Sequence, residues 1–90
     1  MSDEPIVELN ETEALAKAFD AVAALAVKLR VPAELGMRVD IDIGKWEKGT
    51  IIGAGDIKII VHLDSGPTVA CDPTVGIGYF VNGKFEYRED

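Results

Sequence analysis

The spacing of hydrophobic and polar positions changes near Gly36. Between Asn10 and Arg30 apolar residues return every three or four positions, which is the period of an amphipathic helix. From Arg38 onward apolar residues alternate with polar ones, which is the period of strands. One arc of the expected helix carries Leu15, Phe19, Val22, Leu25 and Leu29, together with Ala14, Ala18 and Ala26. The change of period predicts an α+β domain with one N-terminal helix followed by short strands.

Local signals mark both ends of the expected helix. Asn10 can cap the first turn while Glu13 reaches back to it, and Pro32 disfavours helical geometry at the preceding residue. We therefore expect an acidic, frayed segment over residues 1–9 and a helix over residues 10–31 that ends near Arg30. Two interpretations of the apolar arc stay open, because it can pack on the sheet or form a helix–helix seam with a second copy.

The second half of the chain predicts five or six short strands. They are expected at residues 38–43, 50–52, 57–63, 68–71, 79–81 and 84–87, with 57–63 the longest. Residues 44–49 are expected to form a charged turn that carries Trp46. Short strands that end in turn residues must close or be covered to protect their edges. Residues 36–90 are therefore expected to form an antiparallel barrel or a strongly curved sheet, with an open meander covered by the helix as the alternative, and residues 1–90 a single domain.

The last two strands carry the clearest turn signal. Asn82-Gly83 is a favoured two-residue type I′ turn. The register it implies pairs Val81 with Lys84, Phe80 with Phe85, and Tyr79 with Glu86. We expect Phe80, Phe85 and Tyr87 to share the core side of this hairpin. Tyr79 and its neighbours on the opposite side are then expected to be exposed.

Composition narrows the functional classes. The net charge is −7 and residues 1–13 hold five of the sixteen acids without a base, which argues against nucleic acid and anionic membrane as partners. No apolar run approaches the ~20 residues of a membrane span, no signal-peptide pattern is present, and the single cysteine, Cys71, permits no internal disulfide. We expect a cytoplasmic protein. The hydrophobic content of 48% is more than a small core hides, which predicts a homodimer or other homo-oligomer.

Part of the strand region resembles a known architecture. The pattern is Gly36-x-x-Val39, Trp46-x-x-Gly49-x-Ile51 and Val61-x-Leu63-Asp64-x-Gly66, within residues 36–72. It resembles the small SH3-like barrels of the KOW and Tudor type and is similar to plasmid-encoded type II dihydrofolate reductases. The resemblance implies an SH3-like barrel. It implies no catalytic residues, because Thr68-Val69-Ala70-Cys71 stands where the reductases have Val-Gln-Ile-Tyr lining their active pore.

The candidate reactive residues favour structural roles. Asp40 and Asp42 share one strand face with like charge, and a solvated face is favoured over a calcium loop because Ile51 stands where a chelating acid is needed. His62 is the only histidine, so a zinc site lacks ligands, and His62 with Cys71 can form a nucleophile pair only if their strands are neighbours. We therefore predict no catalytic residues, no metal site and no cofactor.

Trp46 and Tyr79 are the predicted binding residues. Aromatic side chains are favoured anchors at protein interfaces, and SH3-like domains place such residues in peptide pockets. The alternative for Trp46 is a plug that folds over the barrel end. The sequence thus favours a small non-catalytic module that binds a protein or peptide and self-associates. The alternative function is an oligomeric enzyme or small-ligand binder whose site lies at a symmetric subunit interface.

Overall fold

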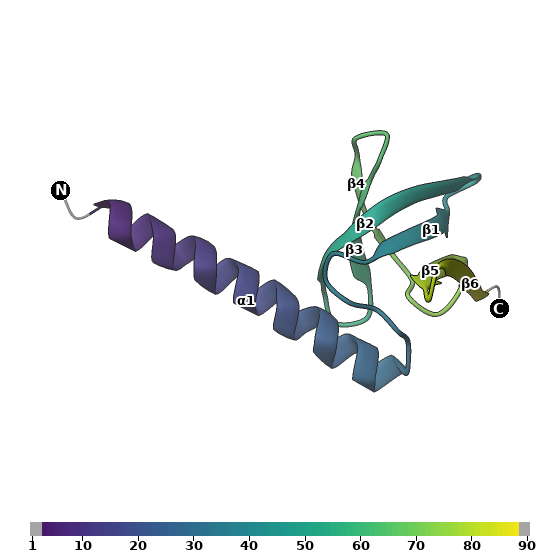
Figure 1. The fold of residues 1–90 in the computed structure, drawn as a ribbon, viewed down its shortest axis with the longest axis horizontal. Helices are drawn as coiled ribbons and strands as arrows, with labels where there is room; N and C mark the ends of the chain where they lie inside the picture. Colours follow the sequence, from purple (N-terminus) through teal and green to yellow (C-terminus); the bar gives the residue numbers. More distant parts are fainter. Residues whose placement is uncertain (1–2, 89–90) are drawn as a thin grey trace.

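The structure is a computed structural model that describes residues 3–88, in which helix α1 precedes an antiparallel sheet (Figure 1). The elements are α1 (Asp3–Leu29), β1 (Arg38–Asp42), β2 (Trp46–Ala54), β3 (Ile59–Leu63), β4 (Thr68–Cys71), β5 (Ile77–Val81) and β6 (Lys84–Arg88). The strand order is β4-β3-β2-β1-β5-β6. Within residues 3–88 no pairing joins β4 to β6, so the sheet is not closed. The predicted α+β class, with one helix and a six-stranded antiparallel sheet, is confirmed.

Helix α1 starts earlier than the sequence pattern predicted. It begins at Asp3, so Asn10 lies inside the helix and does not cap it. Pro5 falls in the first turn of the helix, where its missing N–H costs no helical hydrogen bond. An acidic sequence is also compatible with a first turn, because the N-terminal end of a helix dipole favours negative charge. The longer helix therefore agrees with local chemistry that the capping pattern at Asn10 concealed.

The predicted end of the helix is confirmed. Arg30 follows the last helical residue with a φ of 57°, and the N–H of Val31 donates to the carbonyl oxygen of Ala26 over 3.0 Å. This six-to-one hydrogen bond with a left-handed residue is the Schellman arrangement that ends many helices. Pro32 then keeps the chain extended toward the sheet.

Only the C-terminal part of α1 packs on the sheet. Val22 and Leu25 are buried, whereas the side chains of Leu15 and Phe19 are 64% and 60% exposed. Figure 1 shows why, because most of the helix extends beyond the sheet. The buried apolar residues are Val22, Leu25, Val31, Ala33, Val39, Ile41, Ile51, Ile59, Val61, Leu63, Ile77 and Tyr79. Of the two interpretations of the apolar arc, packing on the sheet therefore holds for its C-terminal half but not for Leu15 and Phe19.

The strand lengths differ from the predicted ones around the first two turns. β2 is the longest strand because its pairing with β1 continues to Asp42 opposite Trp46, which shortens the predicted charged turn to residues 43–45. β3 begins only at Ile59, and Ile57 is 62% exposed. A register shift between Ile51 and Gly53 places a bulge in β2, and the intervening Ile52 faces solvent.

The hairpin of β5 and β6 has the predicted register, but the face that was expected to be exposed is the buried one. Asn82 and Gly83 both have positive φ, as a type I′ turn requires, and Phe80 pairs with Phe85. Tyr79, however, is 0% exposed. The reason is the pairing of β5 with β1, which places Tyr79 opposite Val39 on the core side. The hairpin turn fixes which residues share a face, and the neighbouring strand decides which face is buried.

Candidate functional site

Four aromatic side chains lie together on the outer face of the sheet, the face turned away from the core. Trp46 comes from β2, Phe80 from β5, and Phe85 and Tyr87 from β6. Trp46 and Tyr87 meet edge to face with centroids 5.1 Å apart, Phe85 lies 6.1 Å from Tyr87, and Phe80 lies 5.0 Å from Phe85. We call these four residues the aromatic face. Its chain of ring contacts crosses the sheet from β2 to β6, although the two strands are far apart in sequence.

The aromatic face stays accessible although its rings touch. Trp46 and Phe80 are each 42% exposed and Tyr87 is 47% exposed. Of the two alternatives left open for Trp46, the exposed one holds and the ring does not plug the core; the residue is the first of β2 and does not lie on a turn. Large aromatic residues that keep more than a third of their surface in water are suited to anchor a partner.

Asp40 and Gly78 form the floor under the Tyr87 ring. The Tyr87 hydroxyl donates to Asp40 Oδ2 over 2.8 Å. A Cβ at Gly78 would stand 2.7 Å from two carbon atoms of that ring, so the ring can lie across β5 only because residue 78 has no side chain. The hydrogen bond and the missing side chain together hold Tyr87 in its place between Trp46 and Phe85.

Lys48 completes the charged part of this region. Its Nζ lies 3.9 Å from Asp40 Oδ2 and 5.4 Å from the centroid of the Phe85 ring. The ring face and the buried carboxylate both attract a cation, and Lys48 supplies one from within the chain. The arrangement shows that this surface already accommodates an ammonium group against an aromatic ring.

The predicted role of Tyr79 is not supported by its location. The sequence predicted an exposed binding residue, but the ring is fully buried and its hydroxyl donates to the carbonyl oxygen of Pro73 over 2.5 Å. Burial raises the pKa of the Tyr79 hydroxyl well above its usual value. A side chain enclosed in this way is closed to a partner in this structure, and Phe80 and Tyr87 hold the exposed positions of the hairpin instead, with Phe85 half-buried between them.

Asp40 and Asp42 were both expected to be solvated, but the structure exposes only Asp42. Asp42 is exposed and accepts from the N–H of Gly44, but Asp40 is only 5% exposed because Tyr87 covers it. Arg38, on the same strand, does not pair with these acids and instead donates two hydrogen bonds of 2.7 and 2.6 Å to Asp64. These bonds lower the pKa of the Asp64 carboxyl and raise that of Arg38.

His62 and Cys71 lie on neighbouring strands but on opposite faces. His62 is exposed, and its Nδ1 lies 3.3 Å from the hydroxyl of Thr68, whereas Cys71 pairs with the buried Ile59. Burial raises the pKa of the Cys71 thiol to about 11. A thiol in that state is a poor nucleophile near neutral pH, so the geometry does not assemble the pair.

Two other kinds of feature are absent from the described part of the chain. Residues 3–88 contain no group of three or more His, Cys, Asp or Glu side chains placed to hold a metal ion. Among these residues no helix has both the length and the apolar character to cross a bilayer. The alternative of a small-ligand or catalytic site at a symmetric subunit interface needs a second subunit, and it stays a prediction.

Sequence reasoning found Trp46 and missed its three aromatic neighbours. The predicted hairpin register already put Phe80, Phe85 and Tyr87 on one face, and one more signal was available. Gly78 stands opposite Tyr87 in that register, which is the pattern of a large ring lying over a residue without a side chain.

Comparisons with protein-family models, with curated proteins and with solved structures returned no significant match for this chain.

Proposed function

We propose that this chain is a small non-catalytic binding and assembly module that holds a short segment of a partner protein on its aromatic face. The observation that carries the proposal is the set of four touching aromatic rings, of which three are more than 40% exposed. A domain of 90 residues leaves such a surface in water only at some risk of non-specific association. Binding of a partner segment accounts for it.

The chemistry of the aromatic face favours a basic side chain in the partner segment. Ring faces attract ammonium and guanidinium groups, at about 0.5–2 kcal/mol for each contact. Asp42 lies beside Trp46 in the sheet and adds an exposed negative charge, and the whole chain carries −7. The contact of Lys48 with Phe85 is the intramolecular counterpart of this interaction.

The strand order supports an SH3-like arrangement as part of the proposal. β1 to β4 form a meander, and β5 returns to pair with β1, a strand order compatible with an SH3-like arrangement. The proposal also includes self-association, supported by the exposed residues of α1, and a cytoplasmic location, supported by the free thiol of Cys71.

The test is a selection of random dodecapeptides displayed on phage against the wild-type protein. Peptides that survive are then titrated with fluorescence of Trp46, the single tryptophan, as the readout. We expect selected peptides to be rich in Lys or Arg and to shift the emission of Trp46. The variants Tyr87→Ala and Phe85→Ala should weaken binding at least tenfold, because each removes a ring that the partner contacts.

The matched control is Phe19→Ala, which removes an aromatic ring of similar exposure from the helix. It should leave peptide affinity unchanged. Selected peptides that bind Tyr87→Ala as tightly as wild type would show that the aromatic face is not the site. Failure to enrich any peptide would also count against the proposal.

A further inference from the structure

Helix α1 carries a second exposed apolar surface that the aromatic face does not explain. Leu15, Phe19 and Val27 are 64%, 60% and 80% exposed, and Ala16 and Ala23 are exposed beside them. At 100° per residue these five side chains fall within a sector of about 120°. We call them the helix stripe. It lies next to the buried side of the helix but outside the contact with the sheet.

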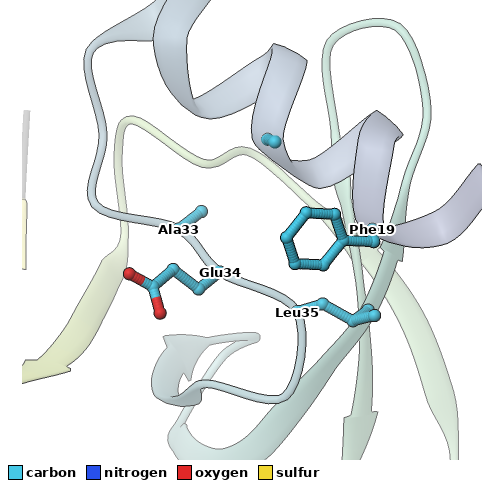
Figure 2. A pocket seen from close by; sticks show the side chains of 5 residues that line it. Phe19, Ala33, Glu34 and Leu35 are labelled. Carbon is cyan, nitrogen blue, oxygen red and sulfur yellow. The ribbon is translucent and has the colours of Figure 1, made fainter. Parts of the chain in front are cut away.

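The helix stripe is hollowed on both sides of Phe19. One hollow is lined by Phe19, Ala23, Ala33, Glu34 and Leu35, and the other by Thr12, Leu15, Ala16, Phe19, Asp20 and Leu35. Figure 2 shows the Phe19 ring extending from α1 toward the loop that carries Ala33 and Leu35. A large ring flanked by the small residues Ala16 and Ala23 is the pattern in which another helix can insert its own large side chains.

The exposed area matches one side of a dimer interface. The chain exposes 5886 Å² of surface, whereas a compact monomer of 9.7 kDa exposes about 5,100 Å². The excess of roughly 790 Å² is close to the ~800 Å² that each partner buries in a stable interface. The radius of gyration of 14.4 Å likewise exceeds the ~12 Å of a compact domain of this length. Both values agree with the elongated shape in Figure 1, where α1 extends beyond the sheet.

The charges along α1 select an orientation for a second helix. Residues 3–13 of the sequence hold five acids and no base, whereas residues 14–30 hold Lys17, Lys28 and Arg30 against the single acid Asp20. Two parallel copies would set acid against acid over the first half of the helix. Two antiparallel copies set the acidic half of each helix along the basic half of the other, which is attractive at both ends of the contact.

We propose that a second copy of this chain occupies the helix stripe, with the two α1 helices antiparallel and the two-fold axis passing near Phe19. This proposal rests on the self-association in the proposed function and names its partner, surface and orientation. With Phe19 at the axis, position 15 of one helix meets position 23 of the other, so each Leu15 enters the hollow beside Ala23. Position 8 of one chain then lies level with position 30 of the other. The protruding half of each helix packs along the sheet-bearing half of its partner.

The mass of the full-length chain tests the interface. Sedimentation equilibrium over a concentration series should give twice the 9.7 kDa of the chain. Phe19→Asp should give the monomer mass with an unchanged circular dichroism spectrum, because the replaced side chain is 60% exposed and lies outside the buried core. Ile57→Asp is the matched control, an apolar side chain of 62% exposure outside the stripe, and it should remain a dimer.

Cysteine cross-linking in a Cys71→Ala background tests the orientation. A mixture of Leu15→Cys chains and Ala23→Cys chains should oxidise to a 15–23 disulfide, and Leu15→Cys alone should not cross-link efficiently. Added salt should weaken the dimer, because it screens the attraction between the acidic and basic halves. A charge reversal at both Lys28 and Arg30 to Glu should weaken it further at low salt.

Several results would overturn the proposal, and they are distinct from failure of the peptide-binding site. A monomer at all concentrations, or a dimer that Phe19→Asp leaves intact, would remove the helix stripe as the interface. Efficient 15–15 disulfides, or a dimer strengthened by salt, would exclude the antiparallel orientation. Peptide titration of Phe19→Asp separates the two proposals, since loss of the dimer should leave the aromatic face able to bind.

Discussion

The two faces of the sheet around β1, β5 and β6 use the same strands for different purposes. On the inner face Val39, Ile41 and Tyr79 are at most 1% exposed and are enclosed by this chain alone. On the outer face Phe80 and Tyr87 keep 42% and 47% of their surface in water. The isolated chain therefore buries the side chains of the inner face by itself. On the outer face it holds the aromatic rings in fixed contact with one another but leaves them exposed to solvent.

Tyr79 and Tyr87 show the same difference between the buried and the exposed face within one hairpin. Each hydroxyl has a specific acceptor, the Pro73 carbonyl oxygen for Tyr79 and the Asp40 carboxylate for Tyr87. Only Tyr87 also presents its ring to solvent. Its hydrogen bond therefore fixes the orientation of an exposed ring, which lowers the entropy lost when a partner binds it.

The largest expected effect separates two isoleucines near the end of β1. Ile41→Ala should lower the free energy of unfolding by about 2–5 kcal/mol, because the side chain is 1% exposed and its loss leaves a cavity. Ile43→Ala, at 44% exposure, should change it by less than about 1 kcal/mol. Urea unfolding of both variants gives the two values. Equal losses would contradict the burial of Ile41 and the exposure of Ile43.

A smaller effect is expected where the backbone supports the aromatic face. Gly78→Ala places a Cβ 2.7 Å from the Tyr87 ring, so the ring must move and its contact with Trp46 changes. We expect a loss of about 1–3 kcal/mol in the free energy of unfolding and a shifted emission of Trp46. Tyr87→Phe keeps the ring over Gly78 and serves as the comparison. Unchanged emission in Gly78→Ala would show that the floor does not position the ring.

The smallest expected effect is a loss of stability at alkaline pH that is caused by Cys71 on β4. Burial raises the pKa of Cys71 from 9.0 to about 11, so the thiol remains protonated in the folded protein while it ionises in the unfolded chain. Its contribution to stability is therefore complete below pH 9 and is lost as the pH rises from 9 to 11. Unfolding curves of wild type and Cys71→Ala should converge or cross over this interval. Parallel curves would contradict the buried environment of the thiol.

Local chemistry in the sequence was sufficient for some elements of the fold. The stop at Arg30 follows from Pro32, and the register of β5 and β6 follows from Asn82-Gly83, because both depend on the conformations open to a few adjacent residues. The start of α1 was missed because the capping pattern at Asn10 expresses only a local preference, and the helix continues through Asn10 back to Asp3.

What the sequence determined by itself is the periodicity: one helix, short alternating strands and a hairpin of known register. The tertiary structure decided which side of each element is covered. Tyr79 is buried because β5 pairs with β1, and Leu15 and Phe19 are exposed because α1 extends beyond the sheet. Periodicity fixes which residues share a face, but burial depends on long-range pairing and on the length of the surface that each element meets.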